Sequence, residues 1–115
     1  MYHRNHLSAS ERQARSRLAR ILHGEPLLCG SLVTMQRTCG KEGCRCTRGE
    51  LHESLYLALR VGKQRKMIHV PHGLEETARR WVGAYQEALR LMQEVSGHCF
   101  AQFQKKKEQA KGARP

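Results

Sequence analysis

Three cysteines and a histidine lie within fourteen residues of one another in the middle of the chain, and no other feature limits the possible folds as strongly. Their spacing is Cys39-x4-Cys44-x-Cys46-x5-His52. Zinc prefers sulfur and nitrogen ligands and takes four of them in a closed, tetrahedral structural site. Three glycines interrupt the cluster, and glycine adopts the positive φ angles that turn several side chains toward one centre. The sequence therefore predicts one structural zinc ion with Cys39, Cys44, Cys46 and His52 as its ligands.

The fourth ligand and the type of metal have alternatives. His52 is the nearest candidate for the fourth position, but another residue of the right chemistry can replace it: Cys29, His69, His72 or Cys99. An iron–sulfur cluster usually takes four thiolates, so its fourth thiol would come from Cys29 or Cys99. A redox-active thiol pair, or reduced cysteines that simply lie in a turn, are the remaining interpretations.

The size and composition of the chain agree with a metal-stabilised domain. Its 115 residues are 39% hydrophobic and only 5% aromatic, which suits a thin core. A bound metal helps so lean a domain to stay folded. Residues 1 to 20 lack the apolar stretch of a signal peptide, and no apolar run approaches the roughly 20 residues of a membrane span. We expect a cytoplasmic protein, where clustered cysteines more often bind metal than form disulfides.

The charge of the chain predicts a polyanionic partner. There are 21 Lys and Arg residues against 10 Asp and Glu residues, which gives a net charge of +11, and 14 of the 21 basic residues are arginine. Arginine binds phosphate through two parallel hydrogen bonds and stacks on bases. Solubility alone is the plainer explanation, but it rarely requires so large an excess. Nucleic acid is therefore the expected partner.

The first expected element is a basic helix. A capping box of Ser10 with Gln13 begins it (Ser8 with Glu11 is the competing choice), and the helix runs to about His23. Residues 1–9 before it are predicted to be a flexible arm. One face of this helix is apolar and much of the remainder is basic, with Ala14, Leu18, Ile21 and Leu22 on the apolar face and Arg12, Arg15, Arg17 and Arg20 elsewhere.

Three strands are expected next. The segment 27–35 predicts a first strand that leads into the cysteine cluster. In the segment 55–61 apolar residues alternate with others, Gly62-Lys63 fits a two-residue type II′ turn, and the segment 65–70 returns. This turn pairs Val61 with Gln64. The resulting register places four apolar residues on the core face, Leu55, Leu57, Ile68 and Val70, and leaves Tyr56, Arg60, Arg65 and His69 on the outer face.

A long helix completes the expected fold. From about Leu74 an apolar stripe recurs at spacings of three and four residues, comprising Leu74, Ala78, Trp81, Tyr85, Leu89, Met92 and Val95. Ser96-Gly97 is expected to kink or end this helix, and Phe100 and Phe103 predict one more short helical piece. The basic segment 105–115 is predicted to be disordered. The fold class is therefore α+β, with a single zinc-stabilised domain over residues 10–104.

Several of these residues resemble a known pattern. The run Gly30-Ser31-Leu32, the block Arg37-x-Cys39-Gly40-Lys41-x-x-Cys44-x-Cys46, then Gly49-x-x-His52, Tyr56-x-Leu and Val70-Pro71 resemble a family of small, uncharacterised bacterial proteins found with mobile genetic elements and beside transposase genes. The resemblance covers about residues 27 to 90. It implies a zinc site at Cys39, Cys44 and Cys46, with His52 as a further candidate, and it implies no reaction. Family members tend to have Gly-Pro after the histidine, where this chain has Glu53-Ser54.

The sequence predicts no enzyme. It contains no catalytic Ser/His/Asp or Cys/His pattern and no phosphate-binding glycine-rich loop. A zinc-bound water with Glu42 or Glu53 as base would be the enzymatic interpretation. However, three thiolates weaken the Lewis acidity of the ion, and so short a chain cannot build a walled pocket.

Two functions are consistent with these features. The first is a zinc-containing accessory protein that binds RNA or DNA and acts with a larger mobile-element enzyme. Its expected nucleic-acid contacts are basic or aromatic and come from the loop, the hairpin and the first helix: Lys41, Arg45, Arg48, Tyr56, Arg60, Arg65, Lys66, Arg12 and Arg15. The second is a protein-interaction adaptor that acts through the long helix. Neutralising Arg45, Arg60 and Arg65 would impair the first function and spare the second.

Overall fold

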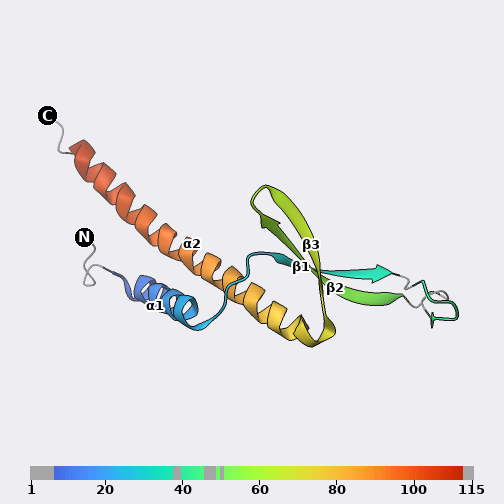
Figure 1. Ribbon diagram of the computed structural model, residues 1–115. Helices are drawn as coiled ribbons and strands as arrows, with labels where there is room; N and C mark the ends of the chain where they lie inside the picture. Colours follow the sequence, from blue (N-terminus) through green and yellow to red (C-terminus); the bar gives the residue numbers. More distant parts are fainter. Residues whose placement is uncertain (1–6, 38–39, 46–48, 50, 113–115) are drawn as a thin grey trace. The chain divides into compact units, whose positions relative to one another are not determined.

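A computed structural model describes residues 7–37, 40–45, 49 and 51–112 of the chain. In chain order it contains helix α1 (Ala9–Gly24), strands β1 (Ser31–Arg37), β2 (His52–Val61) and β3 (Gln64–Val70), the short 3-10 helix η3 (His72–Leu74) and helix α2 (Glu75–Gly112) (Figure 1). The strands form one antiparallel sheet in the order β1-β2-β3. The predicted α+β class, with a helix, a three-stranded sheet and a long helix, is confirmed.

The contacts within the chain gather into two compact units. One comprises Met1–Glu25 with Gln86–Pro115, and the other comprises Pro26–Tyr85. The sheet and the first turns of α2 belong to the second unit, whereas α1 and the remainder of α2 belong to the first. This division does not test independent folding, so the single domain expected over residues 10–104 stays a prediction.

The β2–β3 hairpin has the predicted register. Val61 pairs with Gln64, Leu57 with Ile68 and Leu55 with Val70. Gly62 has a φ of 62°, and no described residue other than glycine has a positive φ. A positive φ at the first turn position alone distinguishes a type II′ turn from a type I′ turn. The two-residue turn therefore fixes which side chains of the hairpin face the core.

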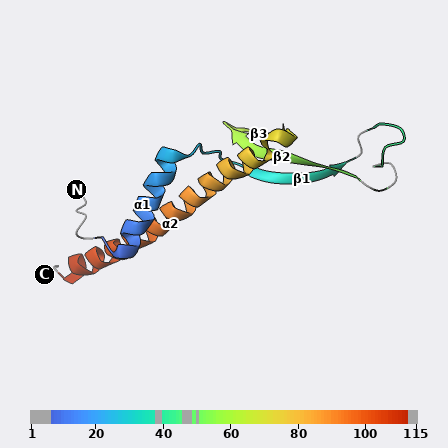
Figure 2. The same cartoon turned by 90° about the horizontal axis from the view of Figure 1, so that it is seen from below.

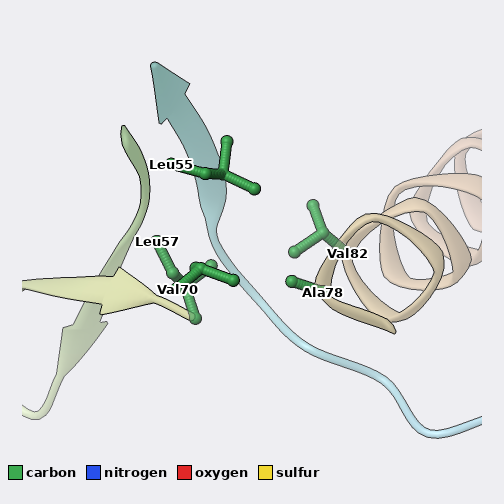
Figure 3. Close-up of a cluster of buried hydrophobic side chains, with 5 residues drawn as sticks. All are labelled: Leu55, Leu57, Val70, Ala78 and Val82. Atoms are coloured by element: carbon green, nitrogen blue, oxygen red, sulfur yellow. The ribbon is translucent and has the colours of Figure 1, made fainter. Parts of the chain in front are cut away.

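The core of the sheet unit lies between the sheet and the first turns of α2. Leu55, Leu57 and Val70 point toward Ala78 and Val82 of α2, and all five side chains are buried (Figure 3). Leu28, Leu32 and Leu59 pack against this cluster.

Ile68 departs from the prediction for this core. It shares the face of Leu57, but 46% of its surface is exposed. Strand β3 is an edge strand, and α2 contributes only two buried residues to this cluster, Ala78 and Val82. The covering helix is thus too narrow to bury the whole apolar face.

Leu57→Ala is expected to destabilise the protein by about 2–5 kcal/mol, because it removes a fully packed side chain and leaves a cavity. Ile68→Ala is the matched control, since it removes a similar volume from the same face at a half-exposed site. We expect it to cost about 1 kcal/mol, in proportion to its smaller buried area. Urea unfolding monitored by circular dichroism measures both values. Equal losses for the two variants would contradict this description of the core.

Strand β1 begins later than predicted, at Ser31 rather than Leu27. The preceding segment is used differently: the backbone N–H of Leu28 donates to the carbonyl oxygen of Trp81 at 3.1 Å. Gly30 passes close to β2, where an added Cβ would lie 2.9 Å from the carbonyl oxygen of Ala58. Only glycine fits this approach without movement of the strands.

Helix α1 uses the alternative N-cap. The Ser8 side chain accepts a hydrogen bond from the Glu11 backbone N–H at 3.1 Å, so Ser8 and not Ser10 is the N-cap. Its buried residues are Ala14, as predicted, and Glu11, whereas Leu22 is 53% exposed. The buried Glu11 carboxylate accepts a hydrogen bond from Arg15 Nε at 2.9 Å.

Helix α2 is one unbroken helix of 38 residues. The helix does not end at Ser96-Gly97, so that part of the prediction is wrong. Phe100 and Phe103, which were expected on a separate short helical piece, lie on α2 itself. The segment predicted to be disordered from residue 105 is helical as far as Gly112. None of the described helices is apolar enough over a sufficient length to cross a lipid bilayer.

Helix α1 lies beside the second part of α2 (Figures 1 and 2). Arg17 Nη2 of α1 donates to Glu87 Oε1 of α2 at 3.1 Å. Ala88 and Leu91 are buried on α2, at 3% and 1% exposure. Leu89 and Met92, which belong to the predicted apolar stripe, are 41% and 46% exposed. The core face of α2 therefore shifts in this part of the helix.

Candidate metal centre and nucleic-acid interface

Two predicted zinc ligands lie next to each other in the β1–β2 loop region. Cys44 Sγ is 3.1 Å from His52 Nε2. Typical zinc–sulfur and zinc–nitrogen bonds in a tetrahedral site put such a pair about 3.6 Å apart. A change of roughly half an ångström in side-chain position would therefore bring both atoms to ligand distance of one ion. Of the other predicted ligands, Cys39 and Cys46 lie outside the described residues.

The strand register brings this pair together. His52 is the first residue of β2 and pairs with Arg37, the last residue of β1, so the ladder closes the loop at its base. Cys44 returns toward that base after a turn in which its backbone N–H donates to the carbonyl oxygen of Lys41 at 3.4 Å. Gly43, directly before Cys44, has a φ of 75°, which a residue with a Cβ adopts at a cost. This confirms the conformation predicted for the loop glycines.

The alternative fourth ligands have other neighbours. His69 contacts the Tyr56 ring, and His72 Nδ1 lies 3.1 Å from Glu75 Oε2. A hydrogen bond with Cys29 raises the pKa of the Tyr85 hydroxyl, and Cys99 Sγ lies 3.7 Å from Arg15 Nη2. Within the described ranges, no group of three or more potential ligands is assembled. Of the three cluster cysteines the structure describes Cys44 alone, and the candidate fourth ligand beside it is His52.

The second candidate site is the sheet face opposite the core. Because side chains alternate along a strand, the register places eleven described side chains there: Ser31, Val33, Met35, His52, Ser54, Tyr56, Ala58, Arg60, Arg65, Met67 and His69. We call this set the outer sheet face. None of these eleven residues is acidic, although the chain as a whole contains 10 acidic residues. The face is thus uniformly neutral or positive.

Two cross-strand pairs give the outer sheet face its chemistry. Arg60 lies directly opposite Arg65, and Tyr56 lies opposite His69. The Tyr56 and His69 rings meet edge to face, with centroids 5.4 Å apart and an interplanar angle of 72°. The hairpin therefore presents two guanidinium groups and an aromatic pair on one surface, as the sequence predicted.

Exposed apolar side chains on this face were not anticipated. Val33, Met35 and Met67 are 36%, 42% and 52% exposed. Val33 lies opposite Tyr56, so apolar surface adjoins the aromatic pair. The apolar residues of β1 can be read from the sequence, but which face of the sheet they occupy depends on the register of β1 against β2. A long loop joins these two strands, so no short turn fixes that register.

The remaining predicted contact residues are distributed unevenly. Lys66 was predicted to contact nucleic acid together with the other hairpin residues, but it lies opposite Leu59 on the core face and does not share their surface. Lys41 and Arg45 are exposed on the loop, and Arg12 is exposed on α1. Arg48 lies outside the described residues. Arg15 is engaged with the buried Glu11, and this hydrogen bond raises the pKa of Arg15. Arg15 Nη2 also lies 3.7 Å from Cys99 Sγ, so Arg15 contacts α2 as well as adding charge.

Comparison with known proteins identifies one relationship. A family model described as a domain of unknown function, DUF6788, matches residues 7–80. This range includes α1, the cysteine cluster and the whole sheet. No curated protein and no solved structure matches the chain significantly.

Proposed function

We propose a nucleic-acid-binding function for this chain, which belongs to the DUF6788 family, a domain of unknown function. The observation that carries the proposal is the outer sheet face, where an arginine pair and an aromatic pair share one acid-free surface. Zinc in the adjoining loop is the second part of the proposal. The predicted association with a mobile element and its larger enzyme remains part of it, and the absence of an enzymatic activity stays a prediction.

The Arg60–Arg65 pair supports phosphate as the ligand. Like charges directly opposite each other across two strands destabilise a sheet, and no carboxylate on the outer sheet face offsets them. A phosphate group placed between the two guanidinium groups would relieve this repulsion and accept hydrogen bonds from both. The Arg60–Arg65 pair therefore costs free energy through repulsion in the isolated protein and contributes favourable contacts in a complex with a polyanion.

The Tyr56–His69 pair supports unpaired bases as the second contact. Bases stack on exposed aromatic rings and on apolar surface once they are not stacked within a duplex. Tyr56 is half-buried and His69 exposed, and exposed Val33 adjoins Tyr56. A sheet face of this composition offers stacking surface to the bases of a single strand, whereas a duplex is read by an element inserted into its groove. Single-stranded RNA or DNA is thus the preferred substrate class.

The zinc ion would order the loop that continues from the sheet. Cys39, Cys44, Cys46 and His52 would bind the ion. The ion would cross-link the loop and take part in no reaction. Lys41 and Arg45 lie on this loop, both exposed. An ordered loop would hold these two charges near the end of β1 and the start of β2. It would thereby extend the positive surface beyond the hairpin.

Fluorescence anisotropy of the zinc-loaded protein tests the function. Labelled single-stranded RNA, single-stranded DNA, double-stranded RNA and double-stranded DNA are titrated across a series of salt concentrations. We expect tighter binding to single strands, which persists at 150–200 mM salt because stacking does not depend on counterion release. Binding that disappears equally for all four probes as salt rises would reduce the proposal to generic attraction by the net charge.

A further inference from the structure

The second part of α2 carries an apolar surface that its own unit leaves exposed. Leu89, Met92, Phe100 and Phe103 are 41%, 46%, 59% and 64% exposed. Phenylalanine is seldom so exposed without a role, and two within four residues form a concentrated patch. We name the set Leu89, Met92, Ser96, Phe100 and Phe103 the α2 stripe.

The α2 stripe lies on one side of the helix and differs from the side that α1 covers. Its spacings are three, four, four and three residues, which keep all five positions on one face of an α-helix. The buried residues of the same stretch, Ala88 and Leu91, are offset from this face by helical geometry. The stripe is thus a second apolar side of a helix whose first apolar side is already packed.

The order of the stripe is symmetric about its centre. Ser96 is the middle residue, with Met92 and Phe100 four residues away on either side and Leu89 and Phe103 seven residues away. In an antiparallel pair of identical helices centred on Ser96, every large apolar side chain meets another one, and the small serines face each other where the helices approach most closely. We propose that the occupant of the α2 stripe is a second copy of this chain, in this antiparallel register.

The charge distribution supports a second copy over other occupants. Residues 86–104 contain two glutamates and one arginine, a net charge of −1 with neutral histidines, in a chain of +11. One of the two glutamates is also engaged within the chain, because Glu87 accepts hydrogen bonds from Arg17 and Arg90. Two strongly basic proteins repel each other on most of their surfaces. The stripe is where two copies can meet without that repulsion, and the nucleic-acid contacts on the sheet remain outside it.

The first experiment measures the mass of the full-length, zinc-loaded protein by analytical ultracentrifugation. Nuclease treatment and high salt remove bound nucleic acid, so the result does not depend on the proposed function. We expect a dimer at micromolar concentration that dissociates at least tenfold more readily in the Phe100→Gln, Phe103→Gln double variant. Ala101→Gln, at an exposed position away from the stripe, is the control and should remain dimeric. A monomer at 100 μM, or a dimer unaffected by the double variant, would overturn the proposal.

A charge exchange tests the antiparallel register. Leu89→Glu and Phe103→Lys each place a charge in the interface and should each give a monomer. Combined in one chain, they would pair glutamate with lysine across the antiparallel dimer and restore association, whereas a parallel dimer would oppose like charges. Circular dichroism checks that each variant keeps its helix content. Failure of the combined variant to associate, with helix content intact, would overturn the register.

Discussion

Replacing Cys44 with serine is expected to release zinc from the purified protein and to lower its unfolding temperature. A serine hydroxyl is a poor zinc ligand, and the sulfur at this position lies 3.1 Å from the His52 imidazole. Structural zinc contributes an apparent binding free energy of about 10–16 kcal/mol in zinc-finger peptides, so losing the ion is among the largest single changes available to a small domain. We expect a loss of at least about 2–3 kcal/mol, or roughly 10–20 °C in a domain of this size.

Metal content measured by native mass spectrometry and thermal unfolding provide the two readouts. Cys29→Ser is the matched control, because Cys29 is exposed and serine can keep a hydrogen bond with Tyr85. It should leave one zinc per chain. An unchanged metal content in Cys44→Ser would refute the zinc assignment, whereas an equal loss in both variants would make Cys29 the fourth ligand in place of His52. His52→Ala then decides the fourth ligand, since only a histidine that binds the ion would weaken its retention.

The hairpin was predictable because a short turn fixes its register. With Gly62-Lys63 as a two-residue turn, one pairing, Val61 with Gln64, determines every other pair. The same pairing also places Lys66 opposite Leu59 on the core face. The core-face position of Lys66 was therefore predictable from the sequence, although Lys66 was predicted as a nucleic-acid contact. The exposure of Ile68 is different. It depends on how wide a surface α2 covers, and the sequence of the hairpin does not contain that information.

The helices show where local signals compete with packing. Ser96-Gly97 predicted an end of α2, because glycine costs about 1 kcal/mol in a helix, yet the helix continues to Gly112. The buried Ala88 and Leu91 and the hydrogen bond from Arg17 of α1 to Glu87 stabilise the turns before this point. Two overlapping apolar sides on α2 also made the stripe ambiguous. The spacing of apolar residues does not determine which side of α2 the shorter helix α1 covers. In the structure, Leu89 and Met92 lie on a side that stays exposed.

The metal site was predictable only in its chemistry. The density of cysteines and glycines indicated a loop that converges on one centre, and the approach of Cys44 to His52 agrees with it. The choice of His52 over more distant histidines depends on strand register. Pairing of Arg37 with His52 places this histidine at the base of the loop, and the sequence of a long loop does not by itself determine that pairing.

Arg60→Ala combined with Arg65→Ala is expected to weaken binding of single-stranded nucleic acid by at least about 100-fold, since each of the two charge-assisted contacts to phosphate contributes about 1.5–3 kcal/mol. The slope of log affinity against log salt should fall by roughly 0.7 for each lost contact to a single strand. Lys66→Ala is the matched control. It removes one positive charge from the same hairpin, opposite Leu59 on the core face of the sheet, and should change the affinity little.

Protein stability separates this role from a structural one. Removing two like charges that lie directly opposite each other should leave the free energy of unfolding unchanged or slightly raised. Tyr56→Ala provides the complementary measurement: it should weaken binding by about 1–3 kcal/mol at every salt concentration without changing the slope, because stacking releases no counterions. If the loss of log affinity per removed charge were the same for the arginine pair and for Lys66→Ala, total charge, rather than the outer sheet face, would determine binding.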